Sequence, residues 1–200
     1  MKTIDEEQHE KYLMKLNEKM KESLKFEEMK QLEEWIDLPI ERIVFDSETE
    51  GIETVGNEES KFQENVMNKN NLIFYIESEE GDRFGVFVKE EIYKLGNGIK
   101  DENGFLFSIK EDKLMKFDLR YYSHKIVTIH YSQKEELMEI GESYIVIMKG
   151  KEKRSKCKSL ESFDCPKDFK LLKENRNEFI LKRIIVLQCK ETEESKQLKR

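Results

Sequence analysis

The sequence predicts a β-rich α+β protein: a two-sheet antiparallel β-sandwich with flanking short helices, preceded by a long N-terminal α-helix. Three observations support this fold class. Short apolar runs separated by turn residues recur along the chain, as at 71–76, 83–88 and 104–109. Several of these runs are apolar at both odd and even positions, which is typical of strands covered on both faces. The first 36 residues instead carry apolar residues at helical spacing.

Residues 4–36 are expected to form one helix, because neither Gly nor Pro interrupts the segment before Pro39. Four residues recur at three- and four-residue steps and form a narrow apolar stripe: Leu13, Leu16, Met20 and Leu24. Segment 1–36 is therefore interpreted as an amphipathic helix that self-associates as a short coiled coil. Two alternatives remain open: its last turns dock on the following domain, or the helix is charged and has no partner.

A second unit, 37–190, is expected to hold the β-sandwich, and 191–200 is a charge run interpreted as a disordered tail. A short helix is expected at 61–68, and segment 150–177 is expected to be an irregular loop. The expected strands lie at 40–45, 71–77, 83–89, 104–110, 113–118, 125–131, 143–149 and 178–189. Polar residues at 79–82 and at 111–112 predict two hairpin turns.

Two positions in these strands carry packing predictions. Gly85 lies between Phe84 and Val86, and a glycine inside a strand usually marks a bulge or a close backbone approach. Phe105 and Phe107 should point to one face of their strand and residue 106 to the other, since side chains alternate along a strand.

Composition narrows the classes of function. The net charge of −7 argues against general nucleic-acid binding, because phosphate contacts favour positive charge. The sequence shows no apolar stretch of about 18 residues that would span a bilayer. Three cysteines are too few for a disulfide framework. These features indicate a cytoplasmic protein with access to the nucleus.

The strongest local charge feature is a basic run that would stand out on an acidic protein: Lys149, Lys151, Lys153, Arg154, Lys156 and Lys158. Such a patch suits an anionic partner, although a solvated loop is the plainer interpretation. Cys157 lies within the run, where neighbouring cations would favour its thiolate and hence its oxidation. It is therefore a candidate redox thiol.

No pattern of catalytic or metal-binding residues accompanies these features. His124 and His130 have no nucleophile or carboxylate at a recognisable spacing, and His9 belongs to the charged helix. Cys157 and Cys165 lack the tight pairing that structural zinc sites use. The sequence therefore predicts a protein that is not an enzyme and that needs no metal or cofactor.

The order of the strands resembles the TLDc domain family from about residue 32 to about 189. Four phrases carry this resemblance: 43–46 followed by Gly51, the hairpin 71–88 with Phe84-Gly85, the run 104–109, and the closing strand 179–187. Family members are associated with resistance to oxidative stress, and some bind the vacuolar proton-pumping ATPase. The resemblance therefore implies a protein-interaction domain and assigns no functional residue.

The sequence thus predicts a non-enzymatic TLDc-like domain that binds protein partners, among them vacuolar ATPase subunits by resemblance, and that self-associates through residues 4–36. The alternative is a nucleic-acid-associated stress regulator that uses the basic run 149–158. A third hypothesis is a redox sensor or enzyme centred on Cys157.

Overall fold

The structure is a computed structural model that describes residues 4–21, 23–51, 60–121, 123, 125–150 and 152–190. Its helical segments are α1 (Ile4–Lys19), α2 (Phe26–Ile36), α3 (Ser47–Glu50), α4 (Lys61–Val66) and the 3-10 turn η1 (Lys173–Asn175). Its strands are β1 (Ile40–Asp46), β2 (Leu72–Ser78), β3 (Arg83–Val88), β4 (Phe105–Lys110), β5 (Lys113–Asp118), β6 (Val127–Ile129), β7 (Glu136–Ile140), β8 (Ile145–Met148), β9 (Arg154–Cys157) and β10 (Glu178–Cys189). The predicted α+β class is confirmed.

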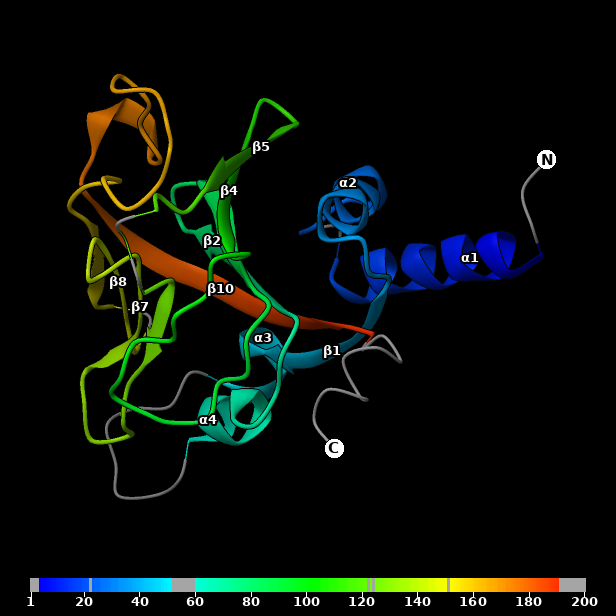
Figure 1. Ribbon diagram of the computed structural model, residues 1–200, viewed down its shortest axis with the longest axis horizontal. Coiled ribbons are helices and arrows are strands. Elements are labelled where there is room, and N and C mark those ends of the chain that lie inside the picture. The colour runs from blue at the N-terminus through cyan, green and yellow to red at the C-terminus, as the bar shows by residue number, and fades with distance from the viewer. Residues whose placement is uncertain are drawn as a thin grey trace.

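The strands of the described chain form one antiparallel sheet in the order β5-β4-β3-β2-β10-β9-β8-β7-β6, and β1 pairs with β10. Strand β10 crosses the middle of the molecule as the long red arrow in Figure 1. Its first residues pair with β9, and its remaining length pairs with β2 and β1. The expected separation into two sheets is therefore not confirmed, because β10 joins both halves.

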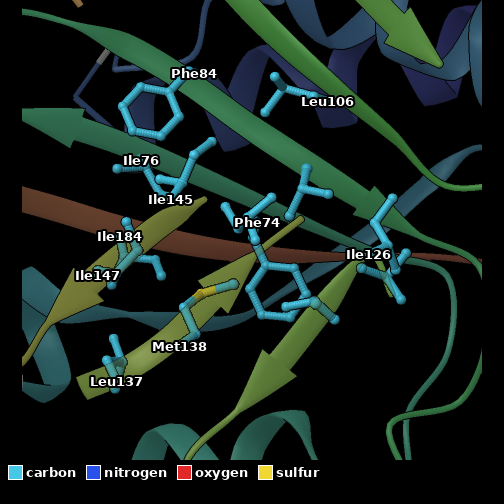
Figure 2. Packing of buried hydrophobic residues seen from close by; sticks show 14 of the residues in the cluster. Phe74, Ile76, Phe84, Leu106, Ile126, Leu137, Met138, Ile145, Ile147 and Ile184 are labelled. Carbon is cyan, nitrogen blue, oxygen red and sulfur yellow. The ribbon is translucent and has the colours of Figure 1, made fainter. Parts of the chain in front are cut away.

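Apolar side chains from the two halves of the sheet meet in the main core. Phe74 and Phe84 reach it from β2 and β3, while Met138 and Ile147 reach it from β7 and β8. Figure 2 shows these groups pointing toward one another, with Ile184 of β10 among them. Burying an aliphatic or aromatic side chain of this size contributes about 1.5–3 kcal/mol, so this core is a major source of stability.

A second core lies on the opposite face of strands β2–β4, between the sheet and the helices α1 and α2 (Figure 1). Ile73 and Tyr75 of β2 point into it, whereas Leu72, Phe74 and Ile76 point into the main core. Strand β2 is thus buried on both faces, as its apolar pattern predicted. Phe105 and Phe107 likewise face the helices and Leu106 faces the main core, which confirms the predicted alternation.

The apolar stripe of the N-terminal segment belongs to this second core. Leu13, Leu16, Met20 and Leu24 are all buried there, together with Met29 and Leu32 of α2. This packing agrees with the alternative in which the N-terminal segment docks on the following domain. The coiled coil is not confirmed, because the stripe contacts the sheet of its own chain. None of the described helices could span a lipid bilayer, since none combines sufficient length with an apolar composition.

The expectation of a single helix over 4–36 is wrong, since α1 ends at Lys19 and α2 begins at Phe26. Lys21 adopts a left-handed backbone conformation with φ of 51°, which stops a right-handed helix. Asn17 then donates its side-chain N–H to the carbonyl of Leu24 at 2.9 Å and fastens the turn. The break was missed because a lysine, and neither Gly nor Pro, takes this conformation.

The sheet satisfies the carbonyl groups that this break frees. Arg183 of β10 donates to the carbonyl of Met20 at 2.9 Å and to the hydroxyl of Ser23 at 3.0 Å. The Tyr75 hydroxyl donates to the Ser23 carbonyl at 2.6 Å. Arg183 is itself buried and forms a two-point ion pair with Asp46, at 3.0 and 2.6 Å. One buried cation therefore links the helical turn, β1 and β10.

Gly85 shows the predicted close approach of backbones. A methyl group placed on it would lie 2.1 Å from the carbonyl oxygen of Phe74 and 2.4 Å from the ring of Phe107. The register across β2, β3 and β4 is regular at this position, so close approach and not a bulge explains the glycine. The hairpin at Glu111 and Asp112 is also confirmed, because both residues have positive φ, as a tight two-residue turn requires.

We expect Gly85→Ala to lower the free energy of unfolding by about 1–3 kcal/mol, because the added carbon overpacks a backbone that cannot move aside. Urea denaturation followed by circular dichroism measures the loss. Lys113→Ala is the control, because Lys113 is exposed on β5 of the same sheet and this change adds no atom against the backbone. Equal losses in both variants would contradict the assigned role of Gly85.

We expect Asp46→Asn to destabilise the protein by about 3 kcal/mol, because it leaves the buried guanidinium of Arg183 without its main counter-charge. Amide hydrogen exchange should also accelerate around Met20 and Ser23, which Arg183 holds. The control is Lys21→Gln, which removes an exposed ion pair with Glu48 at 2.8 Å and should change stability by less than about 1 kcal/mol. If Asp46→Asn is no more destabilising than this control, Arg183 does not fasten the helices.

Candidate functional site

The candidate site consists of the outward side of β9 and the cavity beside it. Strand β9 was missed by the sequence analysis, which expected an irregular loop over 150–177. Its residues pair with β10 on one side and β8 on the other, at Ser155–Phe179 and Val146–Lys156 among others. Because side chains alternate along a strand, Ser155 is buried whereas Arg154 and Lys156 are exposed.

The structure divides the predicted basic run into residues with different roles. Lys149 is almost fully buried, and its ammonium group donates to three carbonyls, those of Tyr131 at 3.1 Å and of Ser132 and Lys134 at 2.8 Å. It therefore fastens the loop between β6 and β7 and is not part of a surface patch. The sequence gave no sign of this burial, because Lys149 is simply the first residue of the basic run.

Lys153 is also engaged, since its ammonium group lies 2.9 Å from a carboxylate oxygen of Glu135. Lys151 lies outside the described residues. Arg154, Lys156 and Lys158 remain exposed, and within the described chain none of them makes an ion pair. These three residues, which we call the β9 cations, are the part of the predicted patch that solvent can reach.

A cavity of about 520 Å³ opens beside β9, and Lys158 lies on its wall. Five basic residues and one acidic residue line it: Arg120, Lys158, Lys167, Lys170, Arg176 and Glu161. Apolar side chains such as Leu160, Phe169 and Leu171 complete the lining. The cavity thus concentrates positive charge in a protein whose net charge is −7. Sequence analysis missed it because Arg120 lies 38 positions before Lys158, too far apart to read as one cluster.

Two polar anchors hold the walls of this cavity. The backbone N–H of Arg120 donates to the Ser162 carbonyl at 2.8 Å, and its guanidinium donates to the Phe163 carbonyl at 2.9 Å. On the other wall, the buried carboxylate of Asp82 accepts from the Lys173 backbone N–H at 2.8 Å and from the Arg176 guanidinium at 2.8 Å. These bonds fix a long segment of irregular chain against the sheet.

Cys157 and Cys165 both line the cavity. Burial raises the pKa of the Cys157 thiol to about 11, because the charged thiolate would lose its hydration there. The neighbouring Cys165 raises it further, and Lys170 offsets only part of this effect. Burial also raises the pKa of Cys165. Burial therefore opposes the activation of Cys157 that neighbouring cations were expected to give, and the role of Cys157 as a redox thiol stays a prediction.

The two described histidines, His9 and His130, do not line this cavity. His130 lies 3.2 Å from a carboxylate oxygen of Glu139, at the β6–β7 edge of the sheet and away from the cavity lining. His9 lies 2.7 Å from Glu33, which connects α1 to α2. His124 lies outside the described residues. Among the residues that the structure describes, no three His, Cys, Asp or Glu side chains are grouped as metal ligands would be.

We expect the rate at which iodoacetamide alkylates Cys157 to rise about tenfold per pH unit from pH 7 to about pH 10, because only the thiolate reacts and its pKa lies near 11. Peptide mass spectrometry resolves the cysteines, and the urea-denatured chain is the control, with a plateau near pH 9. A native plateau at or below pH 8 would show an activated thiol and restore the redox hypothesis.

Comparison with known proteins bears on the family of the chain. A search of curated proteins found no match. A family model of the TLDc domain matches residues 15–175, which is more than half of the chain. This match begins within α1, earlier than the resemblance near residue 32 suggested, and it ends before β10. The chain belongs to the TLDc domain family.

Proposed function

We propose that this protein is a non-enzymatic interaction domain that binds an acidic surface of a partner protein through the β9 cations. The observation that carries the proposal is the exposure of Arg154 and Lys156 on the same side of one strand, without an ion pair among the described residues. Alternate residues of a strand are about 6.6 Å apart, so these charges form a fixed row on a rigid element. Such a row favours specific electrostatic docking.

The buried polar groups of the protein have structural roles, so they are not candidates for binding a partner. Arg183 and Asp46 fasten the helices, Lys149 fastens a loop, and Asp82 holds the cavity wall. Asp101 is likewise buried and accepts backbone N–H groups at Lys89 and Asn103. Strong buried polar contacts therefore serve structure, which leaves the exposed cations as the candidates for recognition.

Family membership extends the proposal. By resemblance to TLDc proteins, subunits of the vacuolar ATPase are candidate partners, oxidative stress is a candidate setting, and the cytoplasm is a candidate compartment. Self-association through residues 4–36 stays a prediction. It would have to use the outward side of α1, where Met14 is half-exposed, since the apolar stripe packs on the sheet.

A second candidate function is nucleic-acid binding by the same row of charges. It is favoured by the exposure of the three cations at 154, 156 and 158, which form no ion pair with any described residue. Binding to a phosphate backbone would weaken steeply and uniformly with salt, whereas docking to one protein surface would depend on the identity of the partner.

We expect the double variant Arg154→Glu/Lys156→Glu to lose at least tenfold in affinity for a protein partner captured from cells and then purified. Lys15→Glu/Lys19→Glu is the matched control, because it makes the same change in net charge on the exposed side of α1. Affinity is measured by biolayer interferometry, and circular dichroism checks the fold. The same proteins are titrated with a fluorescent 20-base-pair duplex.

A partner that binds the β9 variant as tightly as the native protein would contradict the proposal. Salt-dependent duplex binding that the β9 variant loses and the α1 control keeps would instead establish the nucleic-acid function. Turnover of a substrate by the purified protein would contradict the non-enzymatic assignment.

A further inference from the structure

The cavity beside β9 gathers three ammonium groups that form no ion pair with a described residue, and one acidic residue, Glu161, also lines it. Lys158, Lys167 and Lys170 line it and make no salt bridge with any described residue. Arg176 differs, because its guanidinium lies 2.8 Å from Asp82 and 3.4 Å from Glu80, so its charge is already compensated. Three like charges around one opening repel one another, and an anion held between them would relieve that repulsion.

One part of the cavity lining is apolar. Leu171 and Leu172 are buried in its lining, and Phe169 packs against Phe117 with ring centroids 4.5 Å apart. Cys157 on this wall is partly buried, and its burial raises the pKa of its thiol. Charge interactions are stronger in such surroundings than on an open surface. The cavity lining therefore combines apolar side chains with several cations.

The size of the cavity limits what can enter it. Its volume of about 520 Å³ lies in the range of about 300–1,000 Å³ that small-molecule sites occupy. A folded protein or a nucleic-acid duplex would not fit inside, whereas a ring or short chain bearing one anionic group would. Lysine binds phosphate as a point charge, and a phosphate monoester carries about −1.5 to −2 at neutral pH, which suits several ammonium groups better than a carboxylate does.

We propose that this cavity binds a phosphate monoester attached to an apolar body, with the phosphate held by Lys158, Lys167 and Lys170 at the rim and the body against the Leu171–Phe169 side. Such a group belongs either to a free phosphorylated small molecule or to the headgroup of an anionic lipid. The proposal goes beyond partner docking. The two sites share Lys158, but they can be tested separately, because Arg154 and Lys156 do not line the cavity and Lys167 and Lys170 do not belong to the β9 cations.

The test uses the full chain and phenyl phosphate as the probe, with binding measured by nuclear magnetic resonance titration. Phenol lacks the charge and inorganic phosphate lacks the apolar body, so both should bind at least tenfold more weakly than phenyl phosphate. The variant Lys167→Gln/Lys170→Gln should weaken phenyl phosphate binding at least tenfold. Lys15→Gln/Lys19→Gln, with the same loss of charge on α1, should leave it unchanged.

Cysteine labelling locates the bound probe. Phenyl phosphate should slow the reaction of Cys157 and Cys165 with N-ethylmaleimide, because both thiols line the cavity. Cys189 is fully buried in the other core and is the internal control, whose rate should not change. Rates are compared with and without the probe inside each variant, since Lys170 itself lowers the pKa of Cys157.

The two sources of the phosphate are separated by flotation with phosphatidylcholine vesicles that contain phosphatidic acid. Flotation that requires Lys167 and Lys170 would assign the site to a lipid headgroup, and phenyl phosphate binding without flotation would assign it to a free molecule. The proposal is overturned if neither probe binds, if phenol binds as tightly as phenyl phosphate, or if the Lys167→Gln/Lys170→Gln variant binds like the native protein. Loss of partner docking in the Arg154→Glu/Lys156→Glu variant alone would leave this site intact.

Discussion

Strand β10 joins the two halves of the sheet and contributes to both apolar cores. The twelve residues of β10 pair with β9 near Glu178, with β2 along most of their length, and with β1 toward Cys189. Ile184 and Val186 enter the main core, while Ile185 and Leu187 enter the core under the helices. Both layers of apolar packing and both halves of the sheet therefore meet in the same strand, and every other element is positioned relative to it.

The buried guanidinium of Arg183 fixes the position of the α1–α2 pair on the sheet. Apolar contacts alone would allow the helical pair to slide over the sheet, because hydrophobic burial has no preferred angle. Arg183 donates hydrogen bonds to Asp46, to the carbonyl of Met20 and to the hydroxyl of Ser23 simultaneously. Only one position of the α1–α2 turn satisfies all three, since a buried charge without partners is costly.

Local patterns allowed much of the sheet to be predicted, because alternation, glycine and turn residues act over a few positions. Strands β1 to β5, the close approach at Gly85 and the turn at Glu111 follow from such patterns. The break at Lys21 did not, since tertiary contacts hold a residue that has no intrinsic preference for that conformation. The candidate site could not be predicted from local patterns either. The burial of Lys149, and the presence of Arg120 and Lys158 in one cavity lining, depend on how distant segments of the chain pack together.

The position of β10 in the chain has a consequence for synthesis on the ribosome. Strand β1 is complete by residue 46, yet its partner residues in β10 begin at Ile185. The nascent polypeptide therefore carries an unpaired edge on β1 and an incomplete core through some 140 further codons. The hairpins of β2–β5 can form early, because their pairings are local. Closure of the sheet must wait for β10 to emerge, because this one segment joins both halves at once.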